Sequence, residues 1–259
     1  MSGSLPEMGD WDAVFDETYL QTYVPFVDEE RTRTEALGAA VLAGLEPGAE
    51  ILDCPTGFGR HALVLAEAGY RVTGLDRSET LLAEAERRRG DAEWPGLVRG
   101  DYRQLPFEDE SFDAVFNLFT SLGYLERDED VGVLGELGRV LRPGGSLIVE
   151  TTHRDGLARQ LDRQTTRRWD RLPDGGLFLQ ESEPNWVEGT ISTLHLVVLP
   201  AGERIERRFV HRVYSVKEWS ELLREAGFVE VEAIGGWDGE TPATPEAWRL
   251  VLRARRALD

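Results

Sequence analysis

The sequence predicts an α/β fold, in which a doubly wound, Rossmann-like parallel sheet carries an antiparallel insertion. Short apolar runs alternate with helical patterns between about residues 29 and 150. Parallel neighbours need a crossover connection, and alternating strands and helices provide one. Between about 156 and 213 strand-like runs follow one another without helices. A chain of 259 residues is long enough for one large domain of this kind.

The first part of the chain gives the alternating elements in turn. Pro47-Gly48 ends the first helix, and Pro143-Gly144-Gly145 separates the last helix from the strand that follows. In chain order we expect a helix at 29–45, a strand at 51–52, a helix at 60–68, a strand at 71–75, a helix from Ser78, strands at 97–98 and 112–117, a helix around 131–141 and a strand at 146–150.

The second part of the chain departs from this pattern and then returns to it. Strand-like runs at 177–181, 191–199 and 205–213 are joined by turn residues, which predicts an antiparallel insertion. A capping box at Ser215 opens a helix that runs to Ala226, and strands at 228–234 and 249–253 follow. We therefore expect a single domain over 1–259, made of N-terminal helices at 1–46, a core at 47–155 and 214–259, and the insertion at 156–213.

Composition excludes several classes of protein. The net charge is −19, from 48 acidic and 29 basic residues, and a surface this negative repels phosphate backbones and anionic lipid. With Cys54 as the only cysteine, no intramolecular disulfide or cysteine zinc cluster can form. No apolar run approaches the roughly 20 residues of a membrane span. We expect a cytoplasmic protein without nucleic-acid or membrane partners and without a metal site.

Acidic side chains follow three of the predicted strands. Asp53, Asp76 and Asp101 stand at these strand ends, and Asn117 ends the fourth strand. A single strand-end aspartate often only caps the next turn. Three of them around a glycine loop indicate a ligand site, because ligands of open α/β sheets bind outside the carboxyl ends of the strands.

The glycine loop admits two classes of ligand. The segment from Gly57 to Ala62 matches the G-x-G-x-x-A fingerprint, so an NAD(P)-dependent oxidoreductase is one alternative. A pyrophosphate favours a helix N-terminus free of negative charge, whereas Asp53 stands just before the loop and favours a cationic ligand. Asp76, 23 positions later, has the spacing of a ribose-binding acid, and Asp101 can accept a hydrogen bond from an exocyclic amine. Ribose, adenine and a cationic tail together describe S-adenosylmethionine.

Several segments resemble the motifs of class I S-adenosylmethionine-dependent methyltransferases. They are found in order at 51–63, 72–78, 100–101, 105–107 with 111–113, and 141–145. The resemblance implies a seven-stranded sheet whose last strand is antiparallel, with S-adenosyl-L-homocysteine as the product. It also implies that Asp53 serves the methionine amino group, usually through water, that Asp76 binds the ribose and that Asp101 binds the adenine.

The expected cofactor contacts lie in the glycine loop, at the strand ends and on the N-terminal helix. They are Tyr19, Tyr23, Asp53, Thr56, Gly57, Gly59, Arg60, Asp76, Arg77, Gly100, Asp101, Tyr102, Asn117 and Leu118. One position departs from the family pattern, because Pro55 replaces the first glycine of the loop. Proline lacks an N–H donor, so a protein that binds the cofactor without transferring a methyl group is a further alternative.

Methyl transfer from a sulfonium is an in-line displacement that depends on alignment, and a general base helps when the nucleophile carries a proton. His153 after the fifth strand is the first candidate base, with a capping or orienting role as its alternative, and Tyr124 is the second candidate. We expect His61 to pack on its helix. His195 and His211 lie on insertion strands, where sheet surface and pocket are both open to them.

Two side-chain patterns have a structural and a functional interpretation. Trp11, Phe15, Tyr19 and Tyr23 recur every four residues, which fits core packing or a lid over the cofactor. The arginines between 154 and 171 fit a solvated face or a surface that gathers an anionic substrate.

The acceptor is predicted mostly from what the sequence lacks. The segment 117–120 (Asn-Leu-Phe-Thr) is not the Asn/Asp-Pro-Pro-Tyr/Phe signature of amide and adenine methylation, and no Pro-Cys nucleophile for cytosine methylation is present. The insertion and the N-terminal aromatics are expected to cover the active site. We therefore expect methyl transfer to an N or O atom of a small molecule, by a monomer or homodimer.

Overall fold

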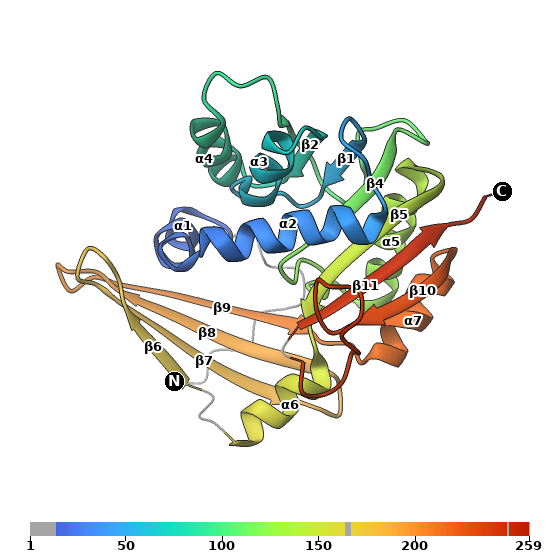
Figure 1. The fold of residues 1–259 in the computed structure, drawn as a ribbon. Helices are drawn as coiled ribbons and strands as arrows, with labels where there is room; N and C mark the ends of the chain where they lie inside the picture. The colour runs from blue at the N-terminus through green and yellow to red at the C-terminus, as the bar shows by residue number, and fades with distance from the viewer. Residues whose placement is uncertain (1–13, 164–166, 248, 259) are drawn as a thin grey trace.

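The computed structural model describes residues 14–163, 167–247 and 249–258. Its main sheet has seven strands in the order β10-β11-β5-β4-β1-β2-β3 (Figure 1). Strand β11 runs antiparallel to its two neighbours, and the other strands run parallel to one another. The strands are β1 (Glu50–Asp53), β2 (Arg71–Asp76), β3 (Gly96–Arg99), β4 (Phe112–Asn117), β5 (Leu141–Thr152), β10 (Phe228–Ile234) and β11 (Arg249–Arg256). This confirms the Rossmann-like class and the antiparallel last strand.

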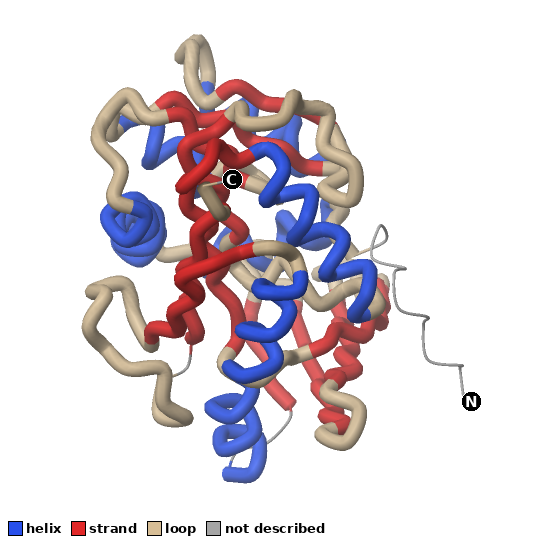
Figure 2. The backbone as a smooth tube through the Cα atoms, turned by 90° about the vertical axis from the view of Figure 1, so that its right-hand side faces the viewer, coloured by secondary structure: helices blue, strands red, loops and turns tan. Residues whose placement is uncertain are grey.

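Helices lie on both sides of this sheet (Figure 2). Successive strand residues point to opposite faces, so Leu52 packs in one core cluster with α5 and α7, whereas Ile51 packs in the other with α2 and α3. Both faces are therefore apolar, which explains why the core strands read as nearly continuous hydrophobic runs. The helices are α1 (Glu17–Tyr23), the 3-10 helix η1 (Val24–Phe26), α2 (Glu29–Ala43), α3 (Arg60–Glu67), α4 (Glu79–Arg89), α5 (Arg127–Val140), α6 (Arg154–Arg163) and α7 (Val216–Glu225).

The insertion forms a separate antiparallel sheet in the order β6-β7-β8-β9. Its strands are β6 (Arg167–Arg171), β7 (Leu177–Asn185), β8 (Thr190–Val198) and β9 (Arg204–Arg212). Along β8, buried and half-buried residues alternate, so one face of the sheet is turned toward the rest of the molecule. Helix α1 lies between this sheet and the core (Figure 1).

Two sequence predictions need correction. The arginine-rich segment before residue 177 contains the additional strand β6, whose alternation is hidden because nearly all its residues are charged. The Pro143-Gly144-Gly145 break does not precede β5 but lies within it, since the pairing with β4 begins at Leu141 and shifts register before Ser146. In the described part of the chain no helix is both long and apolar enough to cross a membrane.

A buried ion-pair cluster fastens α2 to the start of α3. The carboxylate of Glu35 lies 2.6 Å from Nη1 of Arg60 and 3.0 Å from Nε2 of His61, and it accepts a hydrogen bond of 2.7 Å from Nε of Arg31. Burial raises the pKa of Glu35, but the His61 hydrogen bond and the Arg60 charge outweigh it and hold this pKa well below its usual range. Burial and the Arg60 charge lower the pKa of His61 to about 4, so His61 is a neutral donor at pH 7.

Replacing Glu35 by Gln should lower the free energy of unfolding by about 3 kcal/mol at pH 7, because a buried guanidinium loses its counter-charge. The folded-state pKa of Glu35 is depressed, so the stabilisation is complete above the ordinary glutamate pKa and is lost as the pH falls toward the folded-state value. Urea unfolding at pH 7 and pH 3 measures both effects. Glu30→Gln, on the exposed face of α2, is the matched control, and a loss at pH 7 no larger than that of the control would contradict the assignment.

Candidate functional site

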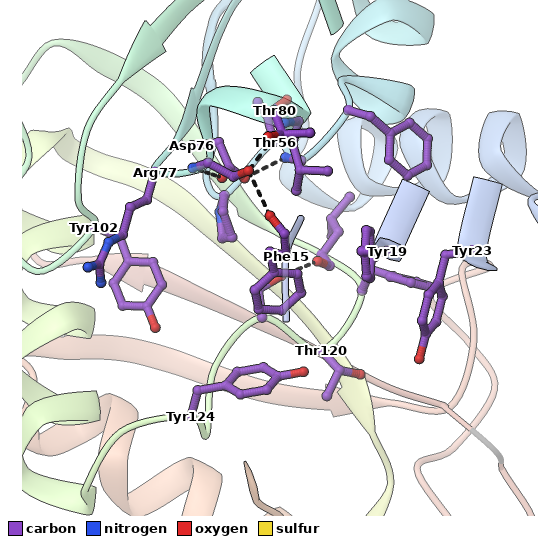
Figure 3. Close-up of a pocket in the computed structure, with 18 of the residues that line it drawn as sticks. Phe15, Tyr19, Tyr23, Thr56, Asp76, Arg77, Thr80, Tyr102, Thr120 and Tyr124 are labelled. Atoms are coloured by element: carbon purple, nitrogen blue, oxygen red, sulfur yellow. Dashed lines mark hydrogen bonds between the residues drawn. The ribbon is translucent and has the colours of Figure 1, made fainter. Parts of the chain in front are cut away.

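One cavity of about 560 Å³ opens at the carboxyl ends of β1, β2 and β4 and extends to the inner face of the insertion sheet (Figure 3). Its volume is in the range of pockets that hold cofactor-sized ligands. The wall on the core side includes Pro55, Thr56, Gly57, Asp76, Arg77, Gly100, Asp101 and Tyr102. The opposite wall includes Gln180, Thr193, His195, Phe209 and His211, and α1 with the residues before it adds Phe15, Tyr19 and Tyr23.

The glycine loop turns tightly between β1 and α3. Gly57 and Gly59 have φ values of +57° and +76°, a region that favours glycine. A Cβ atom on Gly59 would lie 3.0 Å from the Cβ of Ala85, so close helix packing also requires glycine there. Pro55 lines the cavity at the position that resembles a family glycine, after a cis peptide bond, and offers no N–H to a ligand.

The carboxylate of Asp76 is fixed by two backbone donors. The N–H of Gly57 donates to Oδ2 and the N–H of Ser78 donates to Oδ1, both at 2.8 Å. Burial raises the pKa of Asp76, and these two hydrogen bonds oppose the rise. Each carboxylate oxygen can accept more than one hydrogen bond. Asp76 therefore lines the cavity with a set orientation and with acceptor capacity for two hydroxyls.

Asp53 lies behind the cavity wall rather than in it. The hydroxyl of Thr56, which does line the cavity, donates to Oδ2 of Asp53 at 2.7 Å. Oδ1 of Asp53 is buried and has no hydrogen-bond partner among the described residues. Burial raises the pKa of Asp53 to about 7, although the Thr56 hydrogen bond opposes this. Asp53 is therefore placed to act on a ligand indirectly, through Thr56 or a water molecule, and not by direct contact.

Two further predicted residues also stand outside the cavity wall. Asn117 is fully buried, and its Nδ2 donates to the carbonyl oxygen of Cys54 at 2.8 Å, which holds the loop against β4. Gly59 shapes the loop at the start of α3 without lining the cavity. In the structure both residues support the glycine loop, and their contact with the cofactor stays a prediction.

Asp101 lines the cavity and forms an ion pair with Arg103. Both of its carboxylate oxygens accept hydrogen bonds from the Arg103 guanidinium, the shortest at 2.6 Å, and Arg77 lies 3.9 Å away. The Arg103 hydrogen bonds lower the pKa of Asp101. The carboxylate stays ionised, and the neighbouring Tyr102 forms a buried part of the same wall.

The two candidate bases are separated by the structure. Tyr124 lines the cavity, whereas His153 is 1% exposed and does not. The N–H of Gly156 donates to Nδ1 of His153 at 3.3 Å, at the start of α6. The geometry favours the capping role for His153, the alternative that the sequence left open, since it is buried next to Thr152 of the cavity wall without lining the cavity itself.

Aromatic side chains form a closed collar around the outer half of the cavity. Tyr19 stacks on Tyr23 with ring centroids 4.5 Å apart, and the Tyr23 hydroxyl lies 3.4 Å from Nε2 of His195. The collar continues from His195 to Phe209 at 5.0 Å, from Phe209 to Tyr124 at 6.1 Å, from Tyr124 to Phe15 at 5.7 Å and from Phe15 to Tyr19 at 5.2 Å. Figure 3 shows Phe15, Tyr19, Tyr23 and Tyr124 around the same space.

Three of the four aromatic residues of the N-terminal stripe, Phe15, Tyr19 and Tyr23, line the cavity. The structure therefore favours the interpretation of the stripe as a lid over plain core packing. Trp11 lies outside the described residues. His195 and His211 also line the cavity rather than the outer sheet surface. His61 packs against Glu35 as expected and in addition reaches the cavity wall.

A strained turn after β4 was not predicted. Phe119 and Thr120 have φ values of +67° and +57°, which is rare for two consecutive non-glycine residues. The Phe119 ring lies between the guanidinium groups of Arg60 and Arg249, at 4.7 and 5.2 Å. Arg249 also lies 2.8 Å from Glu150, whose other oxygen accepts the Phe119 N–H at 2.7 Å. No local pattern announces this turn, because its supports come from α3, β5 and β11.

For the arginines between 154 and 171, the structure favours the interpretation as a solvated face. Arg154 pairs with Glu218, Arg167 with Glu181 and Arg168 with Asp170. Among the described residues of this segment, none lines the cavity.

Comparison with known proteins agrees with this geometry. A family profile described as "Methyltransferase domain" matches residues 51–145, which contain the glycine loop, Asp76 and Asp101. The profile match, together with the relatives described below, supports a class I S-adenosylmethionine-dependent methyltransferase. These findings support an enzyme whose cofactor is S-adenosylmethionine, in preference to an NAD(P)-dependent oxidoreductase.

Relatives of this methyltransferase fall into two groups. It is 25% identical over 227 residues to a putative methyltransferase, YqeM, of Bacillus subtilis, covering 83% of this chain and 87% of the relative. It is 40% identical over 119 residues to the demethylmenaquinone methyltransferase of Beutenbergia cavernae, covering 46% and 45% of the two chains. The match thus spans about half the length of that second relative.

Solved methyltransferase structures share the fold over nearly the whole chain. The CcbJ methyltransferase from Streptomyces caelestis superposes with a TM-score of 0.76 at 22% identity, covering 95% of this chain and 98% of that one. CalS10, an amino pentose methyltransferase from Micromonospora echinaspora, has a TM-score of 0.69 at 20% identity, with 99% and 100% covered.

Replacing Asp53 by Asn should stabilise the cofactor-free methyltransferase at pH 8 by about 2 to 4 kcal/mol, since one pKa unit corresponds to ~1.4 kcal/mol. The folded-state pKa is raised to about 7, so the native state binds the proton more tightly and loses stability as the pH rises from about 4 through 7. The neutral amide removes this loss. Urea unfolding at pH 5 and pH 8 checks the effect, with exposed Glu183→Gln as control, and an equal difference at both pH values would refute the assignment.

Proposed function

We propose that this methyltransferase transfers a methyl group from S-adenosylmethionine to an N or O atom of a small-molecule acceptor, by in-line displacement. One observation carries the proposal. A single cavity joins the glycine loop, Asp76 and Asp101 on one side to the aromatic collar and the insertion sheet on the other. Cofactor and acceptor can therefore share one enclosure, with the cofactor on the core side and the acceptor inside the collar.

The core-side residues fit the cofactor. Asp76 offers two oriented carboxylate oxygens to the ribose hydroxyls, and the ionised Asp101 with the wall formed by Tyr102 suits the adenine. The buried, unpartnered Oδ1 of Asp53 is an orphan acceptor next to Thr56, in line with a cationic amino group held indirectly. Arg77, Gly100 and Leu118 complete the proposed contacts along the same wall.

Arg60 belongs to the proposed cofactor site in a different way from the other residues. Its guanidinium is engaged by Glu35 and by the hydroxyl of Thr32, at 2.6 and 2.9 Å, and it lies over the Phe119 ring. It therefore contributes positive potential and holds the Phe119–Thr120 turn. Both contacts are made by Nη1, and Nη2, which has no hydrogen-bond partner among the described residues, is left as a donor for the cofactor.

When bound, S-adenosylmethionine supplies a methyl group activated on a sulfonium, which a nucleophile displaces. The chain contributes alignment and exclusion of water, which can account for much of the rate of such a reaction. Tyr19 and Tyr23 close the cavity from α1, and Tyr124 faces them across it. Burial raises the pKa of Tyr124, so its phenol stays protonated and acts as an orienting group instead of a base.

The choice of a small-molecule acceptor rests on the enclosure and on the relatives. The collar surrounds a volume suited to a metabolite, and the structural relatives that cover the whole chain include an amino pentose methyltransferase and a sugar N-methyltransferase. The partial sequence relatives act on demethylmenaquinone by name. The expectations of a cytoplasmic location, of a monomer or homodimer and of no nucleic-acid partner stay predictions from the sequence.

Thermal unfolding with added ligands tests the cofactor assignment. S-adenosylhomocysteine and S-adenosylmethionine, each at about 100 times the dissociation constant, should stabilise the protein by about 2.7 kcal/mol and raise Tm by about 5 to 10 °C. NAD at the same concentration should leave Tm unchanged. Stabilisation by NAD but not by S-adenosylhomocysteine would be incompatible with the proposed site.

Replacing Asp76 by Ala should weaken S-adenosylhomocysteine binding by about 100-fold or more, because two hydrogen bonds to a charged group are lost. Isothermal calorimetry gives the dissociation constant, and Glu108→Gln, an exposed acid before β4, is the control for the loss of a negative charge. Equal affinity of the Asp76 variant and the control would show that the ribose contact lies elsewhere.

A further inference from the structure

His211 has hydrogen-bonding capacity that the remainder of the described site does not use. It lies on β9, lines the cavity and has its ring 5.8 Å from Tyr124 and 6.2 Å from Phe209, at angles of 32° and 34°. The two tilted rings confine the imidazole at the inner edge of the collar. Its Nδ1 is buried and has no hydrogen-bond partner among the described residues. A ligand in the cavity can therefore reach the imidazole only through Nε2.

His195 differs from His211 in this respect. It lies on β8, with Phe209 between the two imidazoles, and its Nε2 is 3.4 Å from the hydroxyl of Tyr23. That contact fastens the lid helix to the insertion sheet. His195 thus already uses one nitrogen for the lid, whereas neither nitrogen of His211 has a hydrogen-bond partner among the described residues.

The surroundings of His211 favour an uncharged ligand group. Burial lowers the pKa of His211 to about 4, so the imidazole is neutral at pH 7. The neighbouring wall of the insertion sheet contributes the neutral polar side chains of Gln180 and Thr193. The four arginines that line the cavity each have an acidic partner: Arg60 and Arg249 pair with buried glutamates, and Arg77 and Arg99 lie next to Asp101 and Glu79. The acidic residues that line the cavity belong to the core side or to the start of α1, namely Asp16, Asp76, Glu79 and Asp101.

We infer that His211 is an acceptor-binding residue: its Nε2 forms a hydrogen bond with an uncharged hydroxyl, amine or amide of the methyl acceptor and so sets the acceptor's orientation. This inference rests on the proposed function and deepens it, because it selects uncharged polar acceptors over anionic ones. An imidazole held between two rings offers one hydrogen bond in a fixed direction. A carboxylate placed there would lie in a neutral, largely desolvated wall without a free counter-charge, which is costly.

Three substitutions separate the hydrogen bond from the shape of the side chain. In His211→Gln the amide reaches the position of Nε2 and either donates or accepts, so the hydrogen bond is retained. His211→Asn fills only the position of Nδ1, and His211→Phe keeps the ring stack without any nitrogen. Arg208→Gln, an exposed change on the same strand, controls for the folding of β9.

The experiment measures S-adenosylhomocysteine formation with a panel of aminosugars, benzylamine and catechol, each paired with a carboxylate-bearing counterpart. With the acceptor that the wild type turns over, His211→Phe and His211→Asn should raise KM about tenfold or more, whereas His211→Gln stays within about threefold. Calorimetry should give the same S-adenosylhomocysteine affinity for all three variants and the control, which shows that the cofactor side is intact. The member of each pair without the carboxylate should be preferred.

The possible failures are distinct. If turnover persists and His211→Phe matches the wild type in KM and kcat, the inference is overturned and the proposed function stands. The same holds if His211→Gln is as impaired as His211→Phe, or if carboxylate counterparts are preferred. If the wild type binds S-adenosylhomocysteine and turns over no member of the panel, the small-molecule acceptor is contradicted, and the inference falls with it.

Discussion

The architecture of the site depends on the carboxylate of Asp76. It accepts one N–H from the glycine loop and one from the start of α4, and so joins the segments that follow β1 and β2. The hydroxyl of Ser78 then donates to the carbonyl oxygen of Phe15 at 2.8 Å, which fastens the chain before α1 to the same point. Loop, sheet and lid are thus held by hydrogen bonds that radiate from one strand end.

Several carboxylates of this site and its surroundings are buried, which is energetically unfavourable unless they are compensated. Asp53, Asp76, Glu35 and Glu150 are all buried, and each is compensated differently. Backbone donors serve Asp76 and arginines serve Glu35 and Glu150, whereas Asp53 has the Thr56 hydroxyl and one oxygen, Oδ1, without a hydrogen-bond partner among the described residues. The least compensated carboxylate is therefore the one expected to meet a cationic group, because a ligand charge completes what the fold leaves open.

Much of the cofactor side could be predicted from sequence because its signals are local. Glycines at positive φ, acids at strand ends and the spacing from Asp53 to Asp76 are set by short stretches of chain. The same reasoning left two roles open for His153, since one or two extra residues of β5 decide whether a side chain reaches the cavity. The strand-end pattern also places Asp53 and Asn117 at the site, but sequence does not show that both lie behind the cavity wall.

The acceptor side could not be predicted because its contacts join distant segments. The collar takes residues from α1, the loop after β4, β8 and β9. The Phe119–Thr120 turn depends on arginines 60 and 249, which are far apart in the chain. Sequence periodicity predicted that Tyr19 and Tyr23 lie on one face of a helix, but it could not show which residues that face contacts.

This division has a consequence for how such an enzyme diverges. The core-side contacts fall almost entirely within residues 53–118, whereas His195, Phe209 and His211 come from a separate sheet. Substitutions on the inner face of that sheet can change the acceptor while the methyl donor site stays as it is. A lineage can therefore exchange one substrate for another by altering a few alternate positions on two neighbouring strands.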